Sequence, residues 1–379
     1  MKPFRSLETL CFDDMQEWRD WIPCKDEYEE FPRLRELSIS RCPKLQGKLP
    51  RHLSSLVKFS IHECEQLVVS IPSLPKLHEF EIVGCKEVNK STVELCLLKS
   101  MVLSIPDLKS LTEEFMHGLA KVENLTINDC KELTSLWPNR FTSLVTLHMI
   151  SCPSLVDINC LTSTLRTLKI VGCSALKSLP MSNCTCIEYA TIEECNSLMF
   201  ISRGQLPPTL KRLEINDCEN LQFVVDKGEA SSSSPSSLLM NEESLCSNFN
   251  YESLLEHLEI RDCPSLKYLC DLPATLKHLD IWGCSELTSL SFRNQLPTAL
   301  VSLIVWFCPK LESIADKLLN NASLEQLEIW NCENLKSLPE GLHRLCHLNK
   351  IDINRCPSVV CFPDEGLLPT SLRELSIRD

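Results

Sequence analysis

Glycine is scarce in this sequence, and its scarcity excludes two common classes of nucleotide-binding site. The 379 residues contain only 9 glycines, and no two of them lie closer than 24 residues apart. The phosphate loop GxxxxGK[ST] and the dinucleotide motif GxGxxG both need closely spaced glycines, because the backbone must approach phosphate groups. The motifs HExxH, GxSxG and CxxC are missing as well. We therefore expect no catalytic site, no cofactor and no metal site in this chain.

Long apolar runs and an excess of positive charge are also missing. No stretch approaches the ~18 apolar residues that a membrane span needs, and the N-terminal residues have no apolar signal segment. With 38 Lys and Arg against 51 Asp and Glu, the net charge of -13 argues against a nucleic-acid partner. We expect a cytoplasmic, or nuclear, protein with no membrane span. Its 23 cysteines, an odd number, then indicate reduced thiols rather than disulfides.

The sequence is rich in leucine, which recurs in the pattern LxxLxIxxCxxL. One clear copy comprises Leu34, Leu37, Ile39, Cys42 and Leu45. Alignment of the other copies places a cysteine at the same phase thirteen times. These phased cysteines are residues 42, 64, 85, 130, 152, 173, 195, 218, 263, 284, 308, 332 and 356. Degenerate copies, one of them with Pro106 in the cysteine position, bring the expected number of repeats to about sixteen.

Apolar residues spaced three and then two apart suit a short strand that stacks on its neighbours and then turns. The sequence therefore predicts a leucine-rich-repeat solenoid, a horseshoe with a parallel β-sheet on its concave face. Convex segments should be irregular or short 3-10 turns, since pairs such as Leu179-Pro180 disfavour an α-helix. We expect one domain over residues 1–379, with a mobile serine-rich insertion at 227–250.

The phased cysteines have a structural and a chemical interpretation. In the first, a small apolar side chain with a weak S–H donor packs in the core and serves buried carbonyls of the turn. In the second, the thiols bind zinc or undergo redox chemistry. Zinc sites need ligands close in sequence, such as CxxC pairs, whereas these cysteines lie a repeat apart. The spacing favours the structural interpretation.

The residue that follows the repeat's isoleucine predicts a contact surface. Strand residues alternate between two faces, so this column points away from the core. It contains Trp282, Trp306 and Trp330 in consecutive repeats, with Arg261 before them and Asn354 after them. The two columns beside it contain Glu259, Asp280, Glu328 and Asp352, and His257 and His278. An aromatic strip edged with acids suits a protein partner that presents an apolar anchor and basic residues. The alternative is that the indoles only stiffen the sheet or lie under another part of the same native protein.

The LxxLxIxxCxxL repeats, the Leu-Pro pairs between them and the opening SLETLCFDDMQEW resemble the C-terminal region of plant coiled-coil nucleotide-binding leucine-rich-repeat (NLR) disease-resistance proteins. The resemblance covers essentially the whole chain. It implies a non-enzymatic domain that senses a pathogen effector or a modified host protein and restrains a switch domain. It also places ADP or ATP only in the nucleotide-binding domain, which this sequence does not contain. The pattern stops at Arg378 and Asp379, just before an expected cysteine, so we expect a longer native protein.

A second class of protein shares the cysteine-type repeat. F-box subunits of ubiquitin ligases use such repeats to recruit substrates, and the sequence leaves this function open as the alternative. Repeats of that class tend to be longer, with helices on the convex side. The short, proline-marked repeats of this chain favour the resistance-protein interpretation.

Overall fold

The computed structural model describes residues 4–22, 31–46, 49–50, 53–70, 74–89, 95–109, 119–136, 141–158, 161–226, 253–269, 272–290, 295–318, 323–360 and 367–378. Its contacts divide the chain into two compact units, Met1–Leu198 and Met199–Asp379. We call them the N-terminal and the C-terminal unit. The insertion predicted at 227–250 lies outside the described residues, and the single domain of about sixteen repeats stays a prediction.

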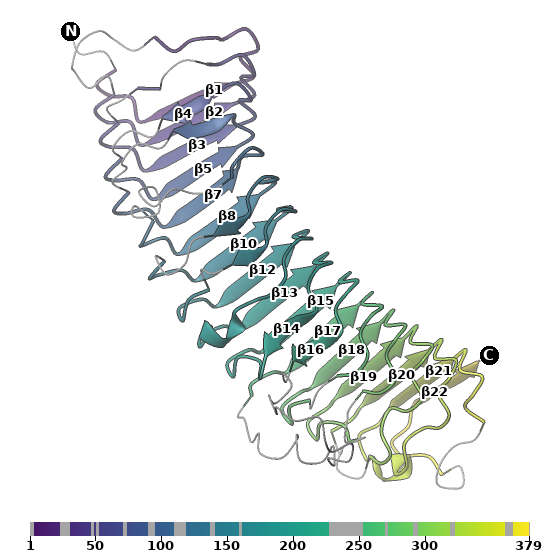
Figure 1. Cartoon of the computed structure of the whole chain (residues 1–379). Coiled ribbons are helices and arrows are strands. Elements are labelled where there is room, and N and C mark those ends of the chain that lie inside the picture. The colour runs from purple at the N-terminus through teal and green to yellow at the C-terminus, as the bar shows by residue number, and fades with distance from the viewer. Residues whose placement is uncertain are drawn as a thin grey trace, which may run out of the picture. The chain divides into compact units, whose positions relative to one another are not determined.

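Both units are parallel β-solenoids (Figure 1), which confirms the predicted leucine-rich-repeat fold class. The described strands of the N-terminal unit's main sheet are β1 (Thr9–Asp13), β2 (Glu36–Ser40), β3 (Lys58–His62), β5 (Glu79–Val83), β7 (Ser100–Ser104), β8 (Asn124–Asn128), β10 (Thr146–Ile150), β12 (Thr167–Val171) and β13 (Tyr189–Glu193). Those of the C-terminal unit are β15 (Arg212–Asn216), β17 (His257–Arg261), β18 (His278–Trp282), β19 (Ser302–Trp306), β20 (Gln326–Trp330), β21 (Lys350–Asn354) and β22 (Glu374–Arg378). Within each unit, neighbouring strands pair so that equivalent repeat positions lie side by side.

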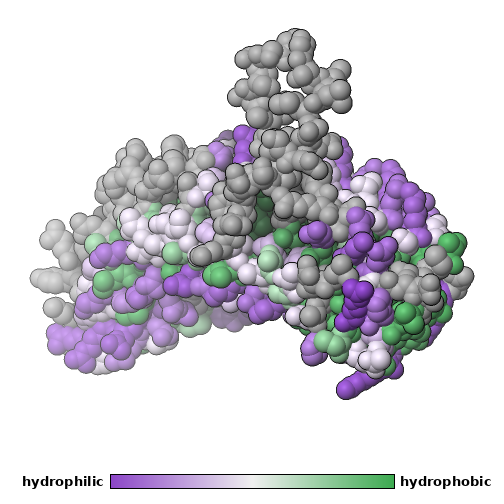
Figure 2. Space-filling view, turned by 90° about the horizontal axis from the view of Figure 1, so that it is seen from below, coloured by the Kyte–Doolittle hydropathy of each residue, from purple (hydrophilic) through white to green (hydrophobic). Residues whose placement is uncertain are grey.

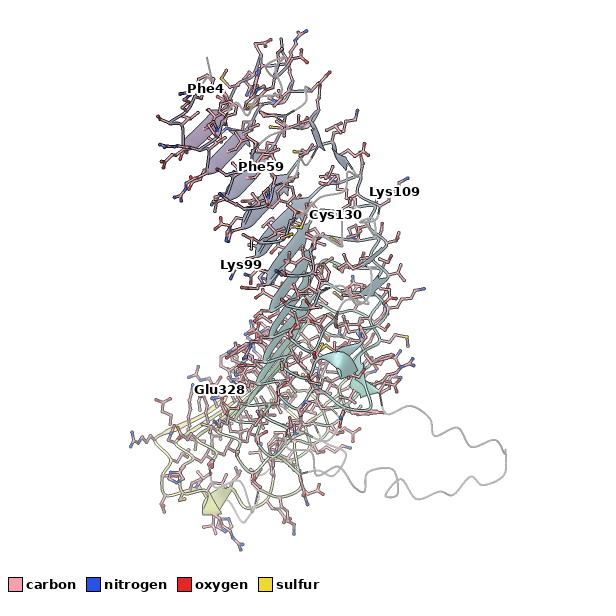
Figure 3. The ribbon with its side chains drawn as sticks, turned by 90° about the vertical axis from the view of Figure 1, so that its left-hand side faces the viewer. Phe4, Phe59, Lys99, Lys109, Cys130 and Glu328 are labelled. Atoms are coloured by element: carbon pink, nitrogen blue, oxygen red, sulfur yellow. The ribbon has the colours of Figure 1, made fainter. Side chains whose placement is uncertain are left out.

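Except for the end strands β1 and β22, each strand of the main sheets buries its second and fourth residues, while most of the first, third and fifth residues point away from the core. Leu37 and Ile39 of β2 are at most 1% exposed, as are Leu327 and Ile329 of β20. Burial of such a side chain contributes about 1.5–3 kcal/mol, and stacked repeats combine these contributions into a continuous core. We call the side formed by the first, third and fifth residues the open face. In Figure 3, Phe59 lies on the core side of the strands.

All thirteen phased cysteines are buried, which confirms that part of the prediction. Most of their thiols donate to the carbonyl oxygen two residues earlier, for example from Cys42 Sγ to Ser40 O at 3.3 Å and from Cys263 Sγ to Arg261 O at 3.3 Å. Burial raises the pKa of the Cys64 thiol to about 11 and that of Cys85 to about 12. Packing and weak hydrogen bonding therefore account for the cysteine at this phase.

The residue before most phased cysteines has a left-handed backbone, as in Asp262 (φ 49°), Gly283 (φ 67°) and Asn331 (φ 54°). The backbone amide of this residue adds one more hydrogen bond to the next strand. The Asp262 N–H donates to Trp282 O at 2.8 Å, and the Gly283 N–H donates to Trp306 O at 3.0 Å. Gly, Asn and Asp tolerate this conformation best. The turn therefore links each repeat to the next through the backbone.

One position in the predicted alignment is wrong. In the repeat of β7, Ile105 and not Pro106 occupies the buried position of the cysteine, since Ile105 is 1% exposed and Pro106 is exposed. The Leu108 N–H donates to Ile105 O at 3.1 Å, as the Leu45 N–H donates to Cys42 O at 3.2 Å. This repeat reaches its turn one residue earlier than the others, which the cysteine phase did not reveal.

The segments opposite the main sheets are irregular or short, as predicted. Two 3-10 turns are described there, Met181–Asn183 and Leu342–Arg344. The sequence did not predict three small parallel pairs: β4 (Val68–Ser70) with β6 (Glu87–Asn89), β9 (Ser135–Leu136) with β11 (Asp157–Ile158), and β14 (Phe200–Arg203) with β16 (Phe223–Asp226). Among the described residues, no helix has the length and apolar character to cross a membrane.

Candidate functional site

Three tryptophans form a continuous ribbon on the open face of the C-terminal unit. Trp282, Trp306 and Trp330 are the last residues of β18, β19 and β20, and the strand register places them side by side. The rings of Trp306 and Trp330 stack with centroids 4.5 Å apart and an interplanar angle of 12°. Those of Trp282 and Trp306 meet edge to face at 5.2 Å. The predicted contact between the three tryptophan rings is confirmed. Their role in binding a partner stays a prediction.

The ribbon is only partly covered by the chain itself. Trp282 is 38% exposed. The indole Nε1 atoms of Trp306 and Trp330 are buried and have no hydrogen-bond partner. A buried donor without an acceptor costs about 1–3 kcal/mol. The ribbon therefore combines exposed aromatic surface with two unpaired donors.

Phe307 enlarges the ribbon, and the sequence analysis missed it. Its ring stacks on Trp282 with centroids 5.9 Å apart and an interplanar angle of 18°, and 43% of the residue is exposed. Phe307 occupies the left-handed position of its repeat with φ 55°. A bulky side chain is unusual in that conformation and adds strain there. An aromatic residue where the neighbouring repeats have Gly283 and Asn331 was the signal that could have revealed it.

The carboxylates beside the ribbon fall into two classes. Glu328 is 6% exposed, accepts from Gln326 Nε2 at 2.7 Å and forms an ion pair with Lys350. The hydrogen bond that Lys350 donates to Glu328 is the main cause that raises the pKa of Lys350. Asp280 and Asp352 each have a buried Oδ1 atom without a hydrogen-bond partner, and burial raises the pKa of Asp280. Figure 3 labels Glu328 on the open face.

Glu259 is already held by cations of the same face. Its Oε1 lies 2.8 Å from Arg261 Nε, and its Oε2 lies 3.9 Å from a terminal nitrogen of Arg212. The Arg261 guanidinium also lies 5.8 Å from the centre of the Trp282 ring. The sequence analysis missed Arg212. It is the residue of the preceding strand β15 that occupies the same repeat position as His257, so the repeat alignment could have revealed it. Of the four predicted acids, Asp280 and Asp352 therefore have oxygens left for a partner's cation.

The two histidines lie next to each other on β17 and β18. The rings of His257 and His278 are tilted by 41°, with centroids 5.5 Å apart. Burial is the main cause that lowers the pKa of His257, and the charge of Arg212 adds to it. The Nε2 atom of His257 is buried without a hydrogen-bond partner.

Comparisons with known proteins find similarity to plant disease-resistance proteins. No protein-family model matches the chain. The putative disease resistance RPP13-like protein 1 of Arabidopsis thaliana is 34% identical over 153 residues, which cover 36% of this chain and 14% of that protein. The disease resistance protein RPS4B of the same plant is 27% identical over 206 residues, which cover 46% of this chain and 17% of that protein.

Solved structures also match the chain, at low TM-scores. The repeat domain of the type III effector XopL covers 74% of this chain and 76% of that one, with a TM-score of 0.36 and 20% identity. An internalin from Listeria monocytogenes covers 80% of this chain and 81% of that one, with a TM-score of 0.34 and 16% identity. The functional assignment depends on the plant relatives and not on these structures.

The chain is thus similar to parts of plant disease-resistance proteins, as the resemblance of its repeats predicted. It spans less than a fifth of the length of these two curated relatives. The coiled-coil subclass stays a prediction, and the ubiquitin-ligase alternative gains no support from these relatives.

Proposed function

We propose that this chain is the non-enzymatic recognition part of a plant immune receptor. It senses a pathogen effector or a modified host protein through the open face of its C-terminal unit, and in the resting receptor it restrains the nucleotide-binding switch domain. The relationship to disease-resistance proteins supports the recognition role. The proposed compartment is the cytoplasm or the nucleus, and ADP or ATP belongs to the switch domain of the longer receptor.

The observation that carries the proposal is the aromatic ribbon, Trp282, Trp306 and Trp330 together with Phe307. Aromatic residues are enriched in the centres of protein interfaces, where they contribute most of the binding free energy. Two members of the ribbon, Trp282 and Phe307, are 38% and 43% exposed. The predicted partner presents an apolar side chain to these rings and a basic side chain to Asp280 or Asp352. Figure 2 shows one face of the molecule, on which hydrophobic residues lie among hydrophilic ones.

The first prediction concerns the ribbon itself. Replacement of Trp282→Ser and Trp306→Ser together should abolish effector-triggered cell death by the full-length receptor in leaves. Loss of interface tryptophans typically costs roughly 2 kcal/mol or more of binding free energy, about thirtyfold in Kd. The melting temperature of the purified chain should change little, because both side chains lie on the open face.

A matched control exists in the N-terminal unit. Ile150 and Val171 occupy the same column and are paired partners on β10 and β12. The double variant Ile150→Ser and Val171→Ser should keep the cell-death response. Full signalling by a folded tryptophan double variant, or an equal loss in the control, would refute the proposed surface.

A further inference from the structure

Three side chains on the open face of the C-terminal unit converge on one point. His257 and Glu259 are the first and third residues of β17, so they point the same way, and Asp280 of β18 is the paired partner of Glu259. Each offers one ligand atom, and these atoms all lie within 4.8 Å of one another. Among the described residues, this is the group of His, Cys, Asp and Glu side chains that is close enough to hold an ion.

Two side-chain atoms of this group are buried and have no hydrogen-bond partner. His257 Nε2 and Asp280 Oδ1 are shielded from solvent and have no hydrogen-bond partner. Most buried polar atoms in proteins have a partner, so two such atoms side by side indicate an absent one. Glu259 gives its Oε1 to Arg261 at 2.8 Å, while its Oε2 lies 3.7 Å from His257 Nε2. That second carboxylate oxygen is shared, since it also lies 3.9 Å from a terminal nitrogen of Arg212.

We infer that His257, Glu259 and Asp280 bind a divalent transition-metal ion of the zinc class. An imidazole nitrogen combined with carboxylate oxygens is a ligand set that zinc accepts, whereas calcium and magnesium prefer oxygen alone. Three protein ligands leave a fourth position for water or for a partner's side chain. Ligand atoms up to 4.8 Å apart must move closer to reach a zinc ion at about 2 Å, and flexible side chains on an open face allow that movement.

The sequence predicted no metal site, because the ligands do not form a short motif. His257 and Glu259 are two residues apart, but Asp280 lies in the next repeat and reaches them only through the strand register. The inference does not depend on the ribbon's binding a protein, since it concerns the purified chain and an ion.

The test is isothermal titration of the 379-residue chain with zinc chloride, after accessible thiols have been blocked with N-ethylmaleimide. We expect one ion to bind per chain. His257→Ala and Asp280→Asn should each weaken zinc binding by at least about tenfold, since changes even to groups that only support metal ligands cost about 10–100-fold. The matched control is His62→Ala, because His62 lies 3.6 Å from Glu81 on the open face of the N-terminal unit, and the described residues bring no third ligand close to this pair. It should keep the affinity of the unchanged chain.

A third variant should improve binding, which a damaged fold cannot imitate. Arg212 lies 3.9 Å from Glu259 Oε2 and competes with an ion for that oxygen. Arg212→Gln should therefore raise the zinc affinity severalfold. Failure of the unchanged chain to bind zinc, or equal binding by the chain and its His257→Ala variant, would overturn the inference. A loss in His62→Ala as large as in His257→Ala would overturn it too.

Discussion

A cysteine at the repeat's turn is valuable for its size and its weak donor and not for its reactivity. Serine would bring a hydroxyl that must find a strong acceptor when buried, and valine would bring no donor for the carbonyl two residues earlier. Desolvation makes the thiolate costly, which is why burial raises the pKa of Cys64 and Cys85. Cys64 and Cys85 should therefore be chemically silent in the folded chain.

The prediction at this scale is a difference in thiol labelling. Cys64 has about a hundredfold fewer thiolates at neutral pH than an ordinary cysteine, and it is 0% exposed. Iodoacetamide followed by peptide mass spectrometry should leave Cys64 and Cys85 unlabelled in the native chain and label both in denaturant. The exposed Cys96 and Cys346 provide the internal control and should react natively. Native labelling of Cys64 at the rate of Cys96 would show that the phased thiols are accessible.

Individual side chains mark the limit of what the sequence could predict at the site. Alignment of equivalent repeat positions placed the three tryptophans side by side correctly, because it depends only on the alternation of side chains along a strand and on the strand register. It could not show that Glu328 and Glu259 already have cationic partners, since ion pairs such as Lys350 with Glu328 depend on rotamers that the sequence does not specify. The expected acidic edge is consequently half neutralised by the chain itself.

Strands are the elements that the sequence predicted best, because apolar spacing of three and then two has few alternative structures. The small pairs such as β4 with β6 were missed, since strands of two to four residues lack a periodic pattern. The position of Ile105 was missed for a related reason. The backbone conformation determines where the turn begins, and the spacing of cysteines in the sequence does not show that conformation. The prediction was therefore secure for the main sheets and weak for the connections.

The turns offer a matched pair of substitutions. Gly283 (φ +67°) and Gly204 (φ +78°) are both left-handed, so alanine at either should cost about 1 kcal/mol of unfolding free energy. A Cβ at Gly283 would also lie 3.2 Å from Asp262 Cγ and 3.3 Å from Asp262 Cα, whereas a Cβ at Gly204 meets nothing within 4 Å. Gly283→Ala should therefore be the more destabilising of the two, by roughly a further 1 kcal/mol in urea denaturation.

The neighbour supplies the check on this explanation. Adding Asp262→Ala should recover part of the Gly283→Ala loss while leaving the Gly204→Ala loss unchanged. Equal losses in the two single variants would mean that backbone conformation alone sets the cost.

At the scale of the whole molecule, the serine-rich insertion interrupts the repeats without supplying a strand pattern. Residues 227–250 follow β16 and precede β17, and β15 pairs directly with β17 in parallel. The main sheet thus continues from β15 to β17, which are its strands before and after the insertion. We expect that excision of residues 227–250 changes the melting temperature by no more than a few degrees, because the free energy of closing a loop depends only weakly on its length.

Replacement of the same residues by a glycine-serine linker of equal length is the comparison for the excised chain. The chain without residues 227–250 and the chain with the linker should have the same melting temperature. A larger fall for either one would make the insertion part of the fold.

The alignment of equivalent residues in neighbouring repeats has a consequence for inheritance. Because each repeat joins the next through the same backbone bonds and the same buried positions, unequal crossing-over that removes or adds one whole repeat leaves the hydrophobic core matched. The columns of the open face are nevertheless shuffled. Loss of the repeat that contains Trp306, for instance, would bring Trp282 beside Trp330 and shorten the ribbon in a single genetic event. Recombination between repeats can therefore change which residues lie side by side on the open face, while the fold is kept.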